Sequence, residues 1–274
     1  MLDPIDEIER LHKFAEVSLT GLNVCGQAKQ SVELNKRIDK VLKRPSRYSS
    51  QEQYDEEVKN AENLESFVSE EKKTGFDFLF SLLILRLWTI LETYIDDLIF
   101  DLLDDQTYFL TNKEVQSIKV PLAYYQGLSL SEQKWFIISE IKNILKSDMG
   151  PGVNHFEPLL RLFDLQGNIN EDVKKVIYEF SQIRNLIAHK NGMVDQTFIK
   201  KCPKFSKKIG EKIYMTNELF HLYKITLIWY LLDIEIRIGR VKGMEKERLC
   251  ELEGFKKDLI GDITELQLKD LFYL

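Results

Sequence analysis

The segment 76–103 constrains the fold of this chain more than any other. Its apolar residues surround most of the circumference of a helical projection, and its longest uncharged run, 78–85, has only eight residues. A helix that is apolar on nearly every side has to be buried among other elements. A membrane span, in contrast, needs about 20 consecutive apolar residues. We therefore expect 76–103 to be the central helix of a soluble helical bundle.

The composition favours the same class. Thirteen glycines and six prolines in 274 residues are few for a β-rich protein, and the net charge of −6 argues against a general polyanion binder. Three scattered cysteines form no metal or redox spacing. The acidic first residues also lack the basic, apolar start of a signal peptide. These features predict a cytoplasmic protein without membrane contact, metal or cofactor.

Periodicity and capping signals place further helices on both sides of the central one. Gly21 and Gly26 should disturb the first helix, 45–50 reads as a linker, and Ser129 with Glu132 forms a capping box. The expected helices are 3–43, 51–73, 76–103, 129–145, 155–163, 171–190 and 216–242, followed by one or two short helices in 244–274.

The expected fold is all-α, an up-and-down bundle with additional N- and C-terminal helices. We divide the chain into an N-terminal helical extension (1–73) packing on the bundle, the bundle itself (74–240) and short C-terminal helices (241–274), whose apolar end, 271–274, should dock on the bundle. An irregular or hairpin segment should follow the helix 171–190, with 212–215 pairing near 193–194 as a short strand.

The helix 171–190 carries the most informative polar residues. Ile177, Phe180, Ile183 and Ile187 form one apolar stripe on a helical projection, and Arg184 falls in its middle. A guanidinium at that position needs a partner or a wet cleft, because an unpaired buried charge is prohibitively costly.

Three more polar residues complete the candidate site. Asn185 and His189 are four residues apart and therefore share a helix face. Glu92 lies at the margin of the apolar arc of 76–103. It has either a purely structural role, as a carboxylate at the margin of the core or as a core partner of Arg184, or a functional role, as a site residue that orients Arg184. Leu186 projects away from the apolar stripe and would suit a dimer interface.

The pattern Arg184-Asn185-x-x-x-His189 resembles the signature of HEPN ribonucleases. The segments His189–Asp195 and Lys212–Thr216, and Arg86–Ile95 with its glutamate, are similar to the RiboL-PSP-type branch of that superfamily. The resemblance covers roughly residues 75–238. It implies a dimerising helical bundle and metal-independent RNA cleavage or, in degenerate members, nucleic-acid binding only. Many relatives act as toxins or in defence against phage, sometimes with a neutralising partner protein.

Cleavage without metal uses the 2′-hydroxyl of RNA as the nucleophile. Histidine can transfer protons at neutral pH, and arginine offers a planar fork that matches phosphate oxygens. One histidine cannot act as base and acid in the same step, so we expect a homodimer that brings a second Arg184/His189 set across a twofold axis. Asn185 would bind the phosphate or fix the imidazole.

Cations for an RNA backbone are concentrated directly after this helix. The segment 190–212 contains seven lysines against two acidic residues in an otherwise acidic chain. Such runs are usually solvated surface, but their position beside Arg184 and His189 favours phosphate contact. The predicted RNA-binding residues are Lys190, Lys200, Lys201, Lys204, Lys207 and Lys208.

Two functions remain open. One is an endoribonuclease using Arg184, Asn185, His189 and Glu92. The other is a catalytically inactive dimerising scaffold, sensor or RNA-binding module. The acidic residues from Asp96 to Asp105 lack a second ligand set, so they indicate a solvated acidic face rather than a two-metal centre. The other histidines, His12, His155 and His221, have no ligand spacing and receive no role.

Overall fold

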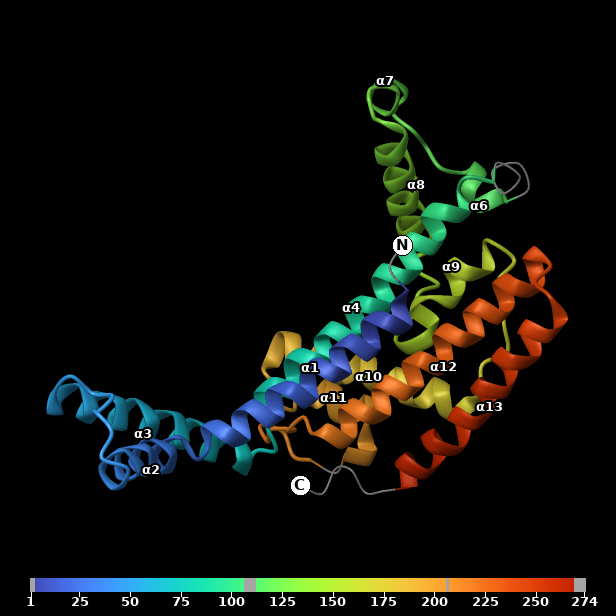
Figure 1. Ribbon diagram of the computed structural model, residues 1–274. Coiled ribbons are helices and arrows are strands. Elements are labelled where there is room, and N and C mark those ends of the chain that lie inside the picture. The colour runs from blue at the N-terminus through green and yellow to red at the C-terminus, as the bar shows by residue number, and fades with distance from the viewer. Residues whose placement is uncertain (1–2, 106–111, 206, 269–274) are drawn as a thin grey trace. The chain divides into compact units, whose positions relative to one another are not determined.

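A computed structural model describes residues 3–105, 112–205 and 207–268, and every element within these ranges is helical (Figure 1). It contains twelve α-helices and two 3-10 helices, with no β-strand in the described ranges. The all-α class predicted from the sequence is therefore confirmed. The expected docking of 271–274 falls outside the described residues.

The helices follow one another with few long connections. In chain order the α-helices are α1 (Pro4–Cys25), α2 (Ala28–Val41), α3 (Gln51–Lys73), α4 (Asp77–Leu102), α6 (Lys113–Gln116), α7 (Leu122–Gln126), α8 (Leu130–Leu145), α9 (Glu157–Arg161), α10 (Glu171–Lys190), α11 (Gln196–Lys201), α12 (Asn217–Lys242) and α13 (Lys246–Leu268); the 3-10 helices are η1 (Gly152–His155) and η2 (Pro203–Phe205).

Capping side chains fix several helix starts where the sequence placed them. The Ser50 side chain accepts from Gln53 N, and Ser129 and Glu132 form a complete capping box. Asn170 accepts from the first backbone N–H groups of α10. That helix ends at Asn191, which adopts the left-handed conformation with φ 50°, followed by Gly192 with φ 79°. Local chemistry therefore sets both ends of α10.

Three expectations about the elements need correction. The predicted helix 155–163 is split into η1 and α9, because the turn begins earlier at Gly152, whose φ is 71°. The C-terminal region forms one helix of 23 residues instead of short helices. The predicted strand pairing consists of a single antiparallel bridge between Met193 and Lys212. Val194 N donates to Glu211 O at 2.9 Å beside this bridge.

The chain divides into two compact units. Unit 1 consists of the chain up to Ile8, the segment Ile84–Ile213 and the chain from Glu218 onward. Unit 2 consists of Glu9–Leu83 and Tyr214–Asn217. The segments 1–73, 74–240 and 241–274 stay a prediction about independently folding regions.

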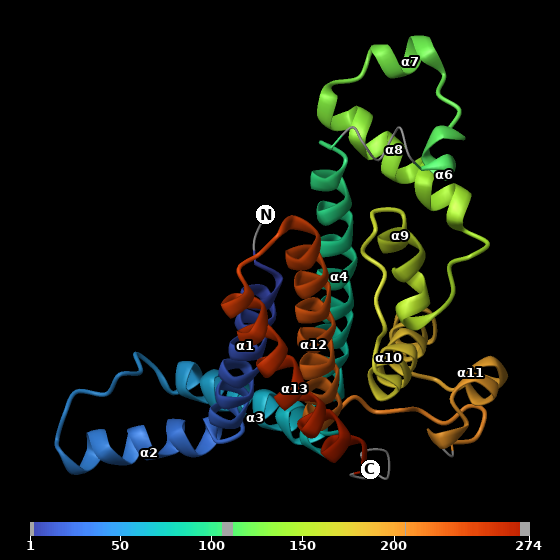
Figure 2. The same ribbon diagram turned by 90° about the vertical axis from the view of Figure 1, so that its right-hand side faces the viewer.

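Aromatic side chains connect the long helices of unit 1. Trp88 of α4 meets Phe180 of α10 edge-to-face with ring centroids 5.2 Å apart, and Phe180 stacks on Tyr223 of α12 at 4.6 Å. Tyr94 of α4 donates to Glu235 of α12 at 2.6 Å, and both views show these two helices side by side (Figures 1 and 2). Trp88, Phe180 and Tyr223 are nearly or fully buried. They form the core that supports α10.

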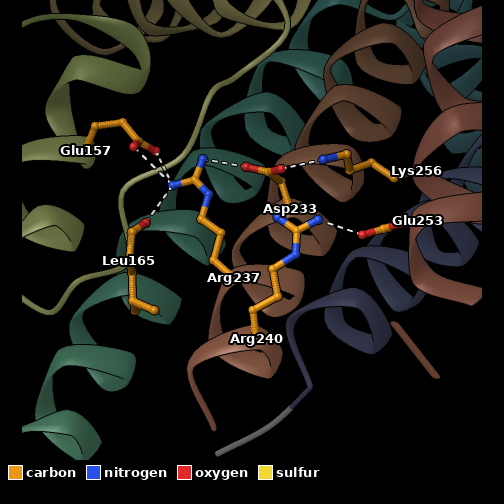
Figure 3. A network of polar contacts seen from close by, with 7 residues as sticks. All are labelled: Glu157, Leu165, Asp233, Arg237, Arg240, Glu253 and Lys256. Carbon is orange, nitrogen blue, oxygen red and sulfur yellow. Dashed lines mark hydrogen bonds and ion pairs between the residues drawn. The ribbon is translucent and has the colours of Figure 1, made fainter. Parts of the chain in front are cut away.

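A buried polar network joins α9, α12 and α13 within unit 1 (Figure 3). Arg237 donates through Nη1 to Glu157 Oε1 and to the backbone oxygen of Leu165, each at 2.9 Å, and pairs through Nη2 with Asp233. Lys256 of α13 pairs with the other oxygen of Asp233. The Arg237 side chain is only 5% exposed, so these partners satisfy a charge that would otherwise be costly to bury.

Unit 2 contains the helical hairpin of α2 and α3. Lys29 Nζ pairs with Glu62 at 2.7 Å, and its backbone N–H donates to Glu65 Oε1 at 2.9 Å. A Cβ added to Gly26 would lie 3.2 Å from Val68 of α3, so the small residue between α1 and α2 allows close approach. The break expected near Gly26 is confirmed, whereas Gly21 lies within α1.

Among the described helices, α4 is the one that is long and apolar enough to cross a membrane. Half of its most apolar window is buried inside the protein, and a single helix of this kind is weak evidence for a membrane span. It also carries Arg86 and Glu92. We therefore do not identify α4 as a membrane span.

Candidate functional site

One face of α10 is apolar and buried, and the polar residues Glu179, Ser181 and Gln182 of this helix are buried as well. Val173, Val176, Ile177, Phe180 and Ile183 are fully buried. Arg184 does not lie in the middle of this face as the projection suggested, since its side chain is 32% exposed. The apolar face therefore ends beside Arg184, which lies at the margin between core and solvent.

Glu92 of α4 is the partner of Arg184. Arg184 Nη2 lies 3.5 Å from Glu92 Oε2, and the Glu92 side chain is 34% exposed. The expected ion pair between Arg184 and Glu92 is therefore present, but it lies at the margin of the core and not inside it, because both groups keep contact with water. Such a half-exposed pair contributes about 0–1 kcal/mol to stability, so its main effect is on the position of the guanidinium.

Two further hydrogen bonds fix this pair. Trp88 Nε1 donates to Glu92 Oε1 at 2.7 Å, and the Trp88 ring is held in the core by Phe180. Arg184 Nη1 donates to Asn185 Oδ1 at 3.1 Å. The structure thus brings Glu92, Arg184 and Asn185 together in one polar cluster supported by a buried indole.

His189 lies on the last turn of α10 and is exposed. No hydrogen bond or ion pair involves its side chain among the described residues. On an ideal helix, residues five apart leave the axis about 140° from each other. A single chain therefore does not join His189 to the pair of Glu92 and Arg184. Asn185, four residues before His189, lies on the same face of α10.

His155, to which the sequence analysis gave no role, lies in the electrostatic field of this cluster. Burial lowers the pKa of His155 below 6.5; Glu92 and Asp96 act against this shift, and Lys142 and Arg184 add to it. The imidazole packs edge-to-face on Phe156 with centroids 4.9 Å apart, and Phe156 lies 5.5 Å from Trp88. His155 and Glu92 are 63 residues apart, so no local pattern could have associated them.

Leu186 is 4% exposed. The expectation that this residue projects outward to a dimer interface is therefore wrong. Residues of neighbouring segments cover it, which a projection of one helix cannot reveal. An interface on this part of α10 would have to use the exposed residues, such as Asn185 and His189.

The predicted RNA-binding lysines are spread over four segments. Lys190 is exposed at the end of α10, Lys200 and Lys201 are exposed at the end of α11, and Lys204 lies in η2. Lys207 is half-buried and Lys208 is exposed. Lys201 and Lys204 line one cavity, together with Lys174 and Lys175 of α10, which were not among the predicted RNA-binding residues.

The acidic stretch at the end of α4 is partly paired with α8. Asp96 pairs with Lys142, and Asp104 pairs with Lys134. Within the ranges that the structure describes, no three His, Cys, Asp or Glu side chains gather in a way that could hold a metal ion. These carboxylates act as partners of helix α8 lysines.

Comparison with models of protein families, with curated proteins and with solved structures finds no match for this chain. The HEPN resemblance therefore depends on the residues of the motif alone, and the geometry around Arg184 is the main basis for a functional proposal.

Proposed function

We propose that the protein is a metal-independent endoribonuclease that acts as a homodimer, with Arg184 and His189 as its catalytic residues. The observation that carries this proposal is the position of Arg184. Its guanidinium is held by Glu92 and Asn185 at a half-exposed margin of the core. A fixed cation that water can reach is suited to a phosphate, whereas a cation serving only the core would be enclosed.

The proposed reaction needs two proton transfers. A base removes the proton of the 2′-hydroxyl, the 2′-oxygen bonds to the adjacent phosphorus, and the bond from phosphorus to the 5′-oxygen breaks as an acid protonates that oxygen. Arg184 stabilises the additional negative charge on the phosphate. His189 of one protomer and its symmetry-related copy serve as base and acid. Asn185 binds the phosphate or orients the imidazole, and Glu92 positions Arg184.

Because no single chain joins His189 to Arg184, the dimer is part of the proposal. The exposed face of α10 with Asn185 and His189 would lie at the twofold axis, where a second copy supplies the missing imidazole. Lys190, Lys200, Lys207 and Lys208 would attract the RNA backbone. In a cell, such an enzyme would act in the cytoplasm as a toxin or as an anti-phage defence effector, with a neutralising or regulatory partner protein.

The test is cleavage of single-stranded RNA by the purified protein. Wild type should produce 2′,3′-cyclic phosphate ends, and His189→Ala and Arg184→Ala should each reduce the rate at least about a hundredfold, the usual scale of a lost proton-transfer group. A 2′-deoxy substitution at the cleaved nucleotide should stop the reaction. The control is Lys257→Gln, an exposed lysine on α13. Unchanged cleavage by His189→Ala would refute the assignment.

The alternative is an inactive dimerising scaffold, sensor or RNA-binding module. One observation favours it: the His189 side chain has no partner among the described residues, although a catalytic imidazole is usually oriented by a neighbour. Expression in a bacterium separates the two functions. A nuclease should be toxic, and Arg184→Ala should relieve the toxicity. A well-tolerated wild type whose purified dimer leaves RNA intact would favour the scaffold.

A further inference from the structure

A cavity of about 430 Å³ lies in unit 1 where η1, the first half of α10 and the segment 201–204 meet. Its volume falls within the range of about 300–1,000 Å³ that is usual for small-molecule sites. It belongs neither to the cluster around Arg184 nor to the network of Arg237. Its lining comes from three segments of the chain, 151–154, 174–179 and 201–204.

Much of the cavity wall is apolar. Pro151, Val153 and Pro203 contribute rigid or branched side chains, and Cys202 contributes a buried thiol. Burial raises the pKa of the Cys202 thiol to about 12, so it stays neutral and offers an apolar sulfur rather than a nucleophile. Tyr178 adds an aromatic ring. Such walls suit a flat, partly apolar group such as a nucleobase.

Cations surround the cavity. Lys174, Lys175, Lys201 and Lys204 line it, against Glu179 as its one carboxylate. Lys174 and Lys175 reach back to acidic residues of the first turn of α10, with side chains that remain 37% and 65% exposed. Lys201 is exposed and has no ion pair among the described residues. In a protein of net charge −6, these lysines form a local concentration of positive charge, which attracts anions.

Glu179 contributes a largely buried carboxylate to the cavity wall. Its side chain is 11% exposed and pairs with Lys204. Burial raises the pKa of Glu179, while the hydrogen bond and charge of Lys204 act in the opposite direction. A buried carboxylate can accept hydrogen bonds from ring N–H and amino groups, which is how Glu and Asp side chains contact nucleobases.

We propose that this cavity binds one nucleotide unit. The base lies against Tyr178 and the proline walls and donates an N–H to Glu179, and the phosphate is bound by Lys174 and Lys201. A nucleotide combines these features in one molecule: a flat base with N–H donors next to a charged phosphate. The proposal does not depend on cleavage, because it concerns binding in the cavity and involves neither Arg184 nor His189, although Lys201 and Lys204 are also among the predicted RNA-binding lysines.

The nucleotide can be free or part of an RNA chain. Tyr178 precedes Asn185 by seven residues and His189 by eleven, so the three share one face of α10, with Asn185 about 10 Å along the helix axis from Tyr178. A chain seated in the cavity would therefore run toward the cluster of Arg184. A free mononucleotide would instead make the cavity a ligand site of its own.

The experiment measures equilibrium binding by calorimetry with the full-length protein. The probes are the four 5′-mononucleotides, inorganic phosphate and a single-stranded 2′-O-methyl RNA, which has no 2′-hydroxyl to attack and cannot be cleaved by the proposed reaction. Lys201→Gln should weaken nucleotide binding about tenfold, the effect of losing one hydrogen bond to a charged group. The combined variant with Lys174→Gln should weaken it further. Glu179→Gln should reduce the preference among bases, and Lys257→Gln, with the same charge change elsewhere, should have no effect.

The binding results distinguish a free nucleotide from a nucleotide that is part of an RNA chain. Mononucleotide binding that depends on Lys201 supports a free ligand, and the same dependence for 2′-O-methyl RNA alone supports a subsite for a chain. The proposal is overturned if inorganic phosphate binds as tightly as a nucleotide, if Lys201→Gln and Lys257→Gln have equal effects, or if no probe binds. Because no probe is cut, these outcomes are independent of whether His189 is catalytic.

Discussion

At the scale of single residues, Glu92 holds Arg184 through an ion pair in which both side chains remain about one-third exposed. Trp88 extends this contact into the core by donating to Glu92 at 2.7 Å. A half-exposed ion pair adds little stability because water solvates both partners well when they separate. The main effect of the ion pair is to hold the guanidinium of Arg184 at one place on the surface of α10.

Replacing Glu92 by glutamine therefore tests its effect on the position of the Arg184 guanidinium separately from its effect on the stability of the protein. Glu92→Gln keeps an oxygen for Trp88 but loses the charge that attracts Arg184. We expect the free energy of unfolding to change by less than about 1 kcal/mol, whereas kcat/KM for RNA should fall about tenfold. The matched control is Asp96→Asn on the same helix, which removes the ion pair with Lys142. If both variants cleave RNA like wild type, Glu92 has no positioning role.

His155 predicts a dependence of stability on pH. Its pKa is lowered below 6.5 in the folded protein, mainly by burial. Between the folded-state pKa and 6.5, the unfolded chain binds a proton that the folded protein does not, so the free energy of unfolding rises with pH in this window. Urea titrations from pH 5 to 7.5 should show that slope for wild type and a smaller one for His155→Gln. Parallel curves for the two proteins would contradict the burial of a neutral imidazole.

At the scale of elements, α9, α12 and α13 are joined by charge as well as by apolar packing. Arg237 reaches two carboxylates and one backbone oxygen, and Lys256 shares Asp233 with it (Figure 3). A Cβ added to Gly167 would lie 2.1 Å from Arg237 Nε, so the guanidinium also fills the space that a larger residue would need. The network fixes both the approach and the register of these segments.

Removing the central cation should cost far more than removing a surface one. In Arg237→Met, the Leu165 carbonyl loses its donor and Glu157 keeps only the hydroxyl of Tyr230 as a donor. We expect a loss of about 3 kcal/mol in the free energy of unfolding. Arg248→Met is the control, because Arg248 forms an exposed pair with Glu251 three residues away. Its expected cost is below about 0.5 kcal/mol. Chemical denaturation measures the free energy of unfolding of both variants. Equal losses would show that the buried network contributes no more to stability than an exposed ion pair.

At the scale of the whole molecule, the proposed enzyme needs two chains. Each α10 provides one His189, and the 2′-hydroxyl reaction needs one base and one acid. The functional unit is then the dimer, and a defect in one protomer disables the shared site. This differs from an enzyme whose two subunits work independently.

Mixing two proteins tests this requirement. After subunit exchange, an equimolar mixture of wild type and His189→Ala contains one quarter wild-type dimers, so RNA cleavage should fall to about one quarter of the wild-type rate if both imidazoles are needed. Independent subunits would retain one half. Light scattering on each protein and on the mixture checks that the dimers persist.

Elements that depend on local chemistry could be predicted from the order of the residues alone. The helices α3, α8 and α10 begin at their capping residues Ser50, Ser129 and Asn170, and α10 ends at the Asn191-Gly192 stop, because caps and left-handed residues act over a few neighbouring positions. The all-α class followed from the same signals together with the apolar segment 76–103. The candidates Arg184, Asn185 and His189 came from the spacing within one helix.

Which segments contact one another could not be predicted in this way and became visible in the folded protein. It placed Arg184 at the margin of the core, covered Leu186, brought His155 into the field of Glu92 and gathered lysines of α10 and of 201–204 around one cavity. A helical projection shows which side a residue occupies but not what packs against that side. Burial, ion-pair partners and cavities depend on contacts between residues far apart in the chain, and these exist only once the helices have packed.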